Sequence, residues 1–324
     1  MRILGREALE ALLPPDDVIT AVERAFRERA AGRATALPRA VLSIGRHGVF
    51  MAMVSALPRL GALGTKLLTV VEGNQRRGLP TIQACYVLVD PETGTPLALL
   101  EAGFLTGIRT GATSAVAARH LARPDSAVAA CFGAGVQARF QLLCLSRVLP
   151  LAEVRVVGRD PARAAAFAGQ MSRELGIPVR VEPSRKAAVA GADLITCATT
   201  SGRPVFSGRD LAPGAHVDAV GSFRPVTREV DTLTIRKSRV VVDTYEGAWE
   251  EAGDLLIPIK AGAITRRHVR AELGEVVAGT RPGRTSPDEI TLFKSVGFAP
   301  EDAVTARLAY DRATAAGLGT EVTL

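Results

Sequence analysis

Residues 126–160 read SAVAACFGAGVQARFQLLCLSRVLPLAEVRVVGRD, and this stretch carries the clearest pattern in the chain. An apolar run, Ala127 to Phe132, leads into a glycine turn. A helical stretch then leads to a second apolar run, Val154 to Val157. Strand, glycine-rich turn, helix and strand in this order form the first half of a dinucleotide-binding βαβ unit. A glycine turn that serves only packing is the alternative interpretation.

The turn itself has the small residues that such a unit needs, in the order G-x-G-x-x-A. Gly133 allows the tight bend, and Gly135 lets the backbone approach a pyrophosphate. Ala138 is small enough for the helix to pack closely on the strand. The start of the helix offers free N–H groups and a positive dipole end to the phosphates. We therefore expect Gly133 and Gly135 to contact a bound dinucleotide.

The end of the second apolar run bears on the choice of nucleotide. NAD-binding units usually place Asp or Glu there to accept from the ribose 2′-OH, whereas a nearby Arg suits a 2′-phosphate. Here Gly158 takes that position, Arg159 follows and Asp160 comes next. We therefore expect Arg159 to favour NADPH, with NADH as the alternative. Arg159 could also face solvent without a cofactor role.

The composition limits the class of protein. A length of 324 residues suits two domains, and the net charge of +7 comes from basic residues spread along the chain among 33 acids, which argues against nucleic-acid binding. The cysteines and histidines show no metal spacing, so no metal is expected. Cys85, Cys131 and Cys197 lie in apolar runs and suit buried free thiols in a reducing compartment. No signal peptide or membrane-spanning run is apparent, so we expect a cytoplasmic protein without a membrane partner.

The chain ahead of the nucleotide unit needs a domain of its own. An amphipathic helix is expected at residues 16–31 and a helix of small residues at 105–121, ending before Arg123-Pro124. Strands are expected at residues 40–44, 49–54, 64–71, 81–90 and 95–100, the last two joined by a turn at 91–94.

From residue 125 onward strands and helices alternate. Strands are expected at residues 128–132, 154–157, 179–181, 194–198, 216–220 and 240–243. This order predicts an α/β fold with a doubly wound parallel sheet. A final helix at 300–316 would pack back on the first domain. The predicted domains are therefore 1–123 with 300–324, a discontinuous α+β domain, and 124–299.

Three cationic side chains in the first domain are candidates for holding a carboxylate: Arg39, Lys66 and Arg109. Lys66 lies in the apolar run GTKLL, where a lysine is unfavourable unless it faces a polar cleft or a partner. Arg109 lies among small residues that leave room for a ligand, and Arg grips carboxylates bidentately. Taken singly, each is better explained as a surface cation or a member of an internal ion pair than as a ligand anchor.

Three further groups of residues drew attention. Lys294 and Ser295 in TLFKSVGF, residues 291–298, would touch nicotinamide or ribose, or the segment would be a hinge between domains. Asp218 is a carboxylate inside a predicted strand and would otherwise bond to neighbouring backbone. The acids expected on a solvated helix face are Glu246, Glu250, Glu251 and Asp254.

Several short segments, in this order along the chain, resemble the motifs of a known family. They are LPR (37–39), GTK (64–66), LPTIQ (79–83), LTGIRTGATSAVAA (105–118), GAGVQARFQ (133–141), GAHVDAVGSFRP (214–225), EAGDLL (251–256) and FKSVGFAPED (293–302). Over nearly its whole length the chain resembles the ornithine cyclodeaminase/mu-crystallin family. The resemblance implies a homodimer whose subunits each combine a discontinuous substrate and dimerisation domain with a Rossmann domain.

The resemblance also implies roles for individual residues. Arg39, Lys66 and Arg109 would anchor the substrate carboxylate, and Arg109 would also lie near the cofactor. Val136 and Gln137 match the diphosphate loop. The remaining cofactor-proximal positions are Thr81 near the nicotinamide, Thr199 near a ribose, and Asp218, Val220, Gly221, Lys294 and Ser295.

Two departures from the family pattern direct the functional hypothesis. Cyclodeaminases carry two acids around the distal amino group of the substrate, and the matching positions here hold Phe223 and Met51. A distal ammonium would therefore lack partners and be costly to bury.

We therefore expect NAD(P)H-dependent reduction of a cyclic ketimine, Δ1-pyrroline-2-carboxylate to L-proline or Δ1-piperideine-2-carboxylate to L-pipecolate. Lys66 would donate the proton, with a pKa lowered by two neighbouring arginines. The alternatives are an ornithine cyclodeaminase or alanine dehydrogenase of the same family, and a non-enzymatic NADPH-binding protein.

Overall fold

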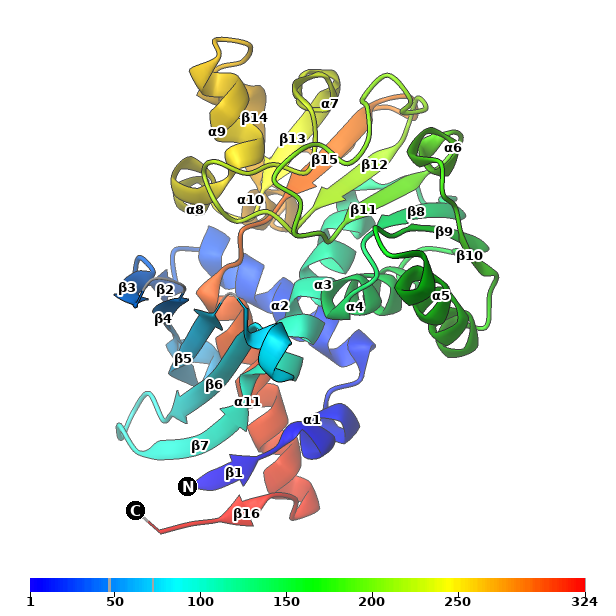
Figure 1. Cartoon of the computed structure of the whole chain (residues 1–324). Helices are drawn as coiled ribbons and strands as arrows, with labels where there is room; N and C mark the ends of the chain where they lie inside the picture. The colour runs from blue at the N-terminus through cyan, green and yellow to red at the C-terminus, as the bar shows by residue number, and fades with distance from the viewer. Residues whose placement is uncertain (46–47, 72, 324) are drawn as a thin grey trace. The chain divides into compact units, whose positions relative to one another are not determined.

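The computed structural model describes residues 1–45, 48–71 and 73–323 (Figure 1). It divides into two compact units. Unit 1 is Met1–Arg109 with Ala299–Leu324, and unit 2 is Thr110–Phe298. Within the described residues each unit is built on one eight-stranded sheet. The roles of these units as substrate and nucleotide domains stay predictions.

The sheet of unit 1 is mostly antiparallel. Its order is β16-β1-β7-β6-β5-β4-β2, with β3 paired to β4 and β1 parallel to β7. Along β4 and β5 buried and less buried residues alternate, as expected for strands with one face on a core. The strands are β1 (Arg2–Leu4), β2 (Thr35–Ala36), β3 (Ala40–Ile44), β4 (Gly48–Leu57), β5 (Ala62–Val71), β6 (Ile82–Val89), β7 (Pro96–Glu101) and β16 (Thr320–Glu321).

Three helices belong wholly to unit 1: α1 (Arg6–Leu12), α2 (Pro15–Ala30) and α11 (Ala299–Ala316). Helix α2 has acids in its first turn and arginines in its last, which complements the helix dipole. Helix α11, close to the C-terminus, packs against α2 and against β4 and β5. The last helix of the chain therefore completes a core that the first strands begin.

Unit 2 contains a parallel sheet with the order β10-β9-β8-β11-β12-β15-β13-β14. From β8 the chain continues to β9 on one side, and β11 pairs with β8 on the other side, so the sheet is doubly wound and its switch point lies between β8 and β11. The predicted α/β fold is confirmed. The strands are β8 (Val128–Phe132), β9 (Glu153–Val157), β10 (Val179–Val181), β11 (Leu194–Cys197), β12 (His216–Ala219), β13 (Ser238–Val242), β14 (Val269–Glu272) and β15 (Ile290–Lys294).

Helices connect these strands, and α3 (Ala102–Leu121) leads into the unit and ends just before the predicted boundary at Arg123-Pro124. The others are α4 (Val136–Leu145), α5 (Pro161–Leu175), α6 (Arg185–Val189), α7 (Thr232–Lys237), α8 (Tyr245–Glu251), α9 (Gly253–Lys260) and α10 (Leu273–Val277). No helix in the described part of the chain combines the length and apolar character of a membrane span.

The sequence analysis missed two strands of this sheet, β14 and β15. β14 is only four residues long and includes Arg270 and Glu272, so it has little apolar pattern. β15 ends in a buried lysine and inserts between β12 and β13, away from its sequence neighbours. Both strands are specified by long-range pairing more than by local periodicity.

Strand β8 leads into the glycine turn and is buried on both faces. Ala129 and Cys131 belong to one core cluster, while Ala130 and Phe132 belong to another. Successive strand residues point to opposite faces, so β8 packs into both layers at once. A strand held on both sides gives the glycine turn at its end a fixed position.

Candidate functional site

The glycine turn after β8 has the backbone that close approach of a diphosphate requires. Gly133 has φ of 118°, and a Cβ there would lie 2.5 Å from the Ala198 carbonyl oxygen. Around Gly135 a Cβ would meet only the Arg163 guanidinium, at 3.7 Å. Contacts within the chain therefore require glycine at position 133, whereas Gly135 leaves open space beside its backbone for a ligand.

Helix α4 starts directly after Gly135, and its N-cap has no side-chain hydrogen bond among the residues that the structure describes. Its first N–H groups and positive dipole end therefore remain available to an anion. The Gln137 Nε2 atom is buried and has no hydrogen-bond partner among the described residues. Buried amides normally have a partner, so a ligand or a water is expected there. Val136 beside it is 64% exposed. These residues fit a dinucleotide diphosphate.

The end of β9 presents arginines in place of an acid. A Cβ at Gly158 would lie 2.7 Å from the Ala164 Cβ, so a carboxylate side chain does not fit there without movement. Asp160 accepts from the Arg163 N–H at 3.1 Å and caps helix α5. Arg159 is exposed at the same end of the strand. This arrangement agrees with the expected place for a 2′-phosphate.

Arg163 is a cation that the sequence analysis missed at this position. Its Nε donates to the Ala134 carbonyl in the glycine turn at 3.1 Å. The sequence does contain a signal for Arg163, because an Asp at a helix N-cap places the residue three positions later in the first turn of the helix. Arg159 and Arg163 together put two positive charges next to the turn.

The loops that follow β11 and β12 meet at Thr199, Val220 and Gly221. The Val220 and Gly221 N–H groups donate to the Cys197 carbonyl at 3.0 and 3.2 Å. A Cβ at Gly221 would lie 2.4 Å from the Thr199 carbonyl oxygen, so this crossing requires glycine. These predicted cofactor residues therefore lie together at the carboxyl ends of adjacent parallel strands, where ligands of such sheets bind.

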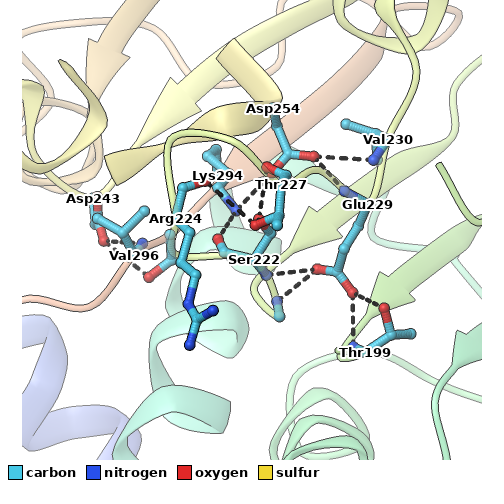
Figure 2. A network of polar contacts seen from close by, with 12 residues as sticks. Thr199, Ser222, Arg224, Thr227, Glu229, Val230, Asp243, Asp254, Lys294 and Val296 are labelled. Carbon is cyan, nitrogen blue, oxygen red and sulfur yellow. Dashed lines mark hydrogen bonds and ion pairs between the residues drawn. The ribbon is translucent and has the colours of Figure 1, made fainter. Parts of the chain in front are cut away.

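Glu229, a buried acid, fastens these two loops to each other (Figure 2). Its carboxylate accepts from the Thr199 N–H and hydroxyl at 2.7 Å each, and from the Gly221 and Ser222 N–H groups at 2.6 and 3.1 Å. Burial raises the pKa of Glu229, whereas Lys294 acts to lower it. Every contact is a donor, which is the set that an ionised carboxylate requires. The sequence analysis gave Glu229 no role.

Lys294, at the end of β15, is fully buried and belongs to the same network (Figure 2). Its Nζ lies 2.9 Å from Asp254 Oδ2 and donates to the Ser222 carbonyl. Asp254 also accepts from the Glu229 and Val230 N–H groups at 2.7 and 3.0 Å. The Lys294 side chain is thus committed inside the unit, and its contact with a cofactor stays a prediction.

The expectation that four acids form one solvated helix face is wrong for Asp254. Glu246 and Glu250 are exposed, but Asp254 is fully buried against Lys294. Helix α8 ends at Glu251 and a second helix, α9, begins at Gly253. The break between the helices removes Asp254 from the exposed face of the first.

Ser295 lies next to Lys294 and is held by Asp243 at the end of β13. Asp243 Oδ2 accepts from the Ser295 hydroxyl at 2.9 Å and from the Val296 and Gly297 N–H groups at 2.7 and 2.8 Å. The loop after β15 is therefore tied to the neighbouring strand. Whether Ser295 contacts a cofactor stays a prediction.

Asp218 is buried in β12 beside a histidine of the same strand. His216 Nε2 lies 3.5 Å from Asp218 Oδ1, and burial raises the pKa of Asp218 while His216 and Ser114 lower it. His216 Nδ1 lies 2.9 Å from the Thr291 hydroxyl, which itself donates to the Leu121 carbonyl. Nδ1 therefore carries a proton. The alternative that Asp218 bonds to backbone is wrong for the described residues, because its oxygens accept no such bond.

Unit 1 holds a buried cluster of four charged side chains. Lys66 in β5 contacts both carboxylate oxygens of Asp302 in α11, at 2.9 and 2.8 Å. Arg109 at the end of unit 1 donates from Nε to Asp302 Oδ1 at 3.0 Å and from Nη1 to Glu301 Oε2 at 2.6 Å. All four side chains belong to residues that are 5% exposed or less. Lys66 and Arg109 are thus internal ion-pair members, and their contact with substrate stays a prediction.

The environment of Lys66 changes its acidity. Burial lowers the pKa of Lys66 to about 8, with Asp302 acting in the opposite direction and Arg109 and Arg39 lowering it further. The expected direction is confirmed, but burial is the main cause and the arginines are secondary. A lysine with this pKa exchanges its proton near neutral pH.

Glu301 and Asp302 are the acids that the sequence analysis did not assign. Asp302 was part of the segment FKSVGFAPED, but its partner Lys66 is 236 positions away in the chain. The available signal was a pair of acids at the start of a helix expected to return to the first domain. Acids in the first turn also suit the helix dipole, so this signal does not single out an ion pair.

Three other predicted positions have plain environments. Thr81 directly precedes β6, and its carbonyl accepts from the Val71 N–H at 2.9 Å. Met51 is 6% exposed within β4, and Phe223 packs against the core of unit 2. Both positions that the family resemblance matches to acids of cyclodeaminases are therefore apolar here. In the described part of the chain no group of three acid, His or Cys side chains could hold a metal ion.

Known proteins resemble this chain along its length. Residues 2–317 match the model of the ornithine cyclodeaminase/mu-crystallin family. A Δ1-pyrroline-2-carboxylate reductase of Bacillus cereus is 36% identical over 324 residues, covering 99% of each chain. The solved Thermococcus litoralis Δ1-pyrroline-2-carboxylate reductase, in complex with NADH and L-proline, is 44% identical with a TM-score of 0.97, covering 99% of this chain and 100% of that one.

An archaeal alanine dehydrogenase, solved as a dimer with bound NAD, is 35% identical with a TM-score of 0.94, covering 100% of this chain and 99% of that one. The family resemblance read from eight short segments is thus confirmed over almost the full length. The chain belongs to the ornithine cyclodeaminase/mu-crystallin family.

Proposed function

We propose that this protein reduces a cyclic ketimine carboxylate with NADPH or NADH, converting Δ1-pyrroline-2-carboxylate to L-proline or Δ1-piperideine-2-carboxylate to L-pipecolate. The observation that carries the proposal is the buried Lys66 in unit 1, which contacts both carboxylate oxygens of Asp302 and has a pKa lowered to about 8. Two reductases of Δ1-pyrroline-2-carboxylate, from Bacillus cereus and Thermococcus litoralis, support it as relatives.

Three cations of unit 1 would hold the substrate carboxylate. Lys66 and Arg109 are buried and form ion pairs with Glu301 and Asp302. Arg39 is half-buried and lies close enough to lower the pKa of Lys66. Arg holds carboxylates in a defined orientation, so a ligand with one carboxylate suits this group of cations.

Two apolar side chains favour a cyclic imine over ornithine as the substrate. Met51 and Phe223 stand where cyclodeaminases have acids, and neither can partner an ammonium group. An unpaired ammonium is costly to remove from water, whereas a ring made of CH2 groups gains from apolar surroundings. A cyclic imine therefore suits these two positions better than an open-chain diamine does.

Reduction of the C=N bond needs one hydride at carbon and one proton at nitrogen. A bound nicotinamide supplies the hydride. Lys66 would donate the proton at the ring nitrogen, and its pKa of about 8 suits a donor near neutral pH. Asp302 contacts Lys66 through both oxygens, so it would act as a positioning residue that also favours the protonated ammonium.

The cofactor would be held mainly at the carboxyl ends of the strands of unit 2. Gly133, Gly135, Val136 and Gln137 with the start of α4 would bind the diphosphate, and Arg159 with Arg163 the 2′-phosphate of NADPH. Thr81, Arg109, Thr199, Asp218, Val220, Gly221, Lys294 and Ser295 are proposed as further cofactor-proximal residues.

We also propose that the protein is a homodimer of the cytoplasm. Every residue of β3 is exposed, including Val41 at 60% and Leu42 at 63%, so both faces of this strand carry exposed apolar side chains that suit contact with a second copy. The related alanine dehydrogenase was solved as a dimer. The four cysteines form no disulfide among the described residues, which suits a reducing compartment.

The test follows the loss of reduced nicotinamide by absorbance with freshly made Δ1-pyrroline-2-carboxylate and with each cofactor separately. Rapid oxidation that yields L-proline is expected. Parallel reactions with L-alanine plus NAD, and with L-ornithine without added reductant, test the dehydrogenase and cyclodeaminase alternatives. Nucleotide binding without turnover of any of these compounds would instead favour a binding protein.

A further inference from the structure

A basic hollow lies on unit 2 at the amino ends of β13 and β14. It has a volume of about 630 Å³, and an adjoining hollow of about 340 Å³ shares four of its lining residues. Most of the lining comes from the end of α7, the starts of β13 and β14 and the short 3-10 turn that precedes β14, Arg266–His268. Tyr245, residues 281–282 and Glu289 complete it. None of these segments belongs to the proposed cofactor or substrate residues.

The hollow gathers cations that are far apart in the sequence. Six lysine and arginine side chains line the larger hollow, against one acid, Glu289, among its described lining residues. They are Arg236, Lys237, Arg239, Arg267, Arg270 and Arg281. The basic residues seemed evenly spread along the chain, so this concentration is a product of the fold.

Two of these cations have an acid nearby: Arg239 lies 3.6 Å from Glu289, and Arg281 lies 3.9 Å from an acid of α10. The other four form no ion pair within residues 1–45, 48–71 and 73–323. They are Lys237, which donates to the Gly208 carbonyl at 3.0 Å, and Arg236, Arg267 and Arg270, which line both hollows. Like charges held close together repel one another, and a bound anion would relieve that repulsion.

The wall that carries two of these arginines is held in place. His268 Nε2 lies 2.7 Å from the Ile235 carbonyl, which ties the 3-10 turn to α7. The Arg266 guanidinium lies over the Trp249 ring, 5.2 Å from its centre. The backbone at Arg267 thus lies between two anchored neighbours, and a site with an ordered backbone loses less entropy on binding.

The hollow is separate from the dinucleotide site. The glycine turn and its neighbouring loops lie at the carboxyl ends of the parallel strands, whereas the hollow lies at the amino ends. β13 has five residues and so spans about 16 Å. A ligand in the hollow would therefore not be the cofactor diphosphate in its own site.

We propose that this hollow binds a small anion that carries two or more linked phosphate groups. Arginine forks match phosphate oxygens bidentately, and several forks from different segments suit adjacent phosphates better than one isolated anion. The volume lies in the range of small-molecule sites, which is about 300–1,000 Å³. The polar, cationic lining suits an oligophosphate and not an apolar ligand.

Isothermal titration with inorganic tripolyphosphate, on protein saturated with NADPH, tests the proposal. The double variant Arg267→Gln/Arg270→Gln is expected to weaken binding at least about tenfold. The matched control is Arg173→Gln/Arg185→Gln, which removes the same charge from exposed positions elsewhere in unit 2 and is expected to bind like the unchanged protein. Titrations with adenosine triphosphate and with adenosine then distinguish a nucleotide ligand from a free oligophosphate. The proposal requires that the triphosphate chain binds, and it does not require that adenosine binds.

Several results would overturn the proposal. They are no binding of tripolyphosphate at 0.1 M salt, equal loss of affinity in the two double variants, and orthophosphate binding as tightly as tripolyphosphate. Tighter binding of a single-stranded oligonucleotide than of tripolyphosphate would point to nucleic acid instead. Circular dichroism of both variants, expected to match that of the unchanged protein, shows that the comparison is between folded chains.

Discussion

Replacing Asp302 with Asn tests the charge cluster of unit 1 most directly. The substitution keeps the shape of the side chain but removes the negative charge that contacts Lys66 at 2.8 and 2.9 Å and Arg109 at 3.0 Å. Removing one partner of a buried ion pair costs about 3–5 kcal/mol, because the remaining charges stay buried without compensation. We expect Asp302→Asn to lower the free energy of unfolding by about this amount, measured by urea denaturation.

The same substitution should change the pH dependence of turnover. Asp302 is the group that opposes the lowering of the Lys66 pKa, so without it burial, Arg109 and Arg39 move that pKa further below 8. Proton donation needs the ammonium form, which is lost as pH rises through the pKa. The alkaline fall of kcat should therefore begin at a lower pH in Asp302→Asn than in the unchanged protein.

Asp311→Asn is the matched control for this experiment. Asp311 lies on the same helix and pairs with Arg307 at 2.8 Å, but its side chain is 51% exposed. Exposed pairs of this spacing contribute about 0.3–0.5 kcal/mol, so little change is expected. Equal stability of the two variants, or an alkaline limb that does not move in Asp302→Asn, would refute the proposed coupling of Asp302 to Lys66.

Three further changes test other parts of the reasoning. Lys66→Met should reduce turnover by about 10²–10⁴-fold while NADPH still binds by fluorescence titration. The folded-state pKa of Lys66 lies below the unfolded value, so the unfolded chain binds more protons between pH 8 and 10.5. Relative to Lys66→Met, the unchanged protein should therefore gain stability as pH rises through that window, measured by urea denaturation at each pH. Arg159→Gln/Arg163→Gln should weaken NADPH at least about tenfold and leave NADH nearly unchanged, in titrations of each nucleotide; equal loss for both would remove the 2′-phosphate role. Val41→Lys/Leu42→Lys should yield monomers by light scattering, and an unchanged mass would exclude β3 from the interface.

The start of unit 2 was predictable because its signals are local. An apolar run, two glycines and a helix within one short stretch determine β8, the turn and α4, and the structure has all three at the expected residues. The close contacts that a Cβ atom would make at Gly133 and Gly158 add detail but do not alter this conclusion.

Features that depend on distant residues were not predictable from the sequence. Lys66 and Arg109 were identified as unusual cations, but their acid partners lie about two hundred positions further along the chain. Glu229 and Asp254 had no local pattern, and Asp254 was misplaced because a helix break was not foreseen. The basic hollow similarly brings together segments that are far apart in the sequence, and hydrophobic periodicity does not predict their contact.

The position of α11 in unit 1 has a consequence for the order in which the chain matures. Unit 2 is contiguous, so its sheet can form while synthesis continues, although domains usually fold from the N-terminus onward. Unit 1 completes its buried ion pairs late, because Lys66 pairs with Asp302, and Arg109 with Glu301 and Asp302, which are synthesised nearly two hundred or more positions later. A nascent chain therefore cannot close this charged cluster until α11 has been made.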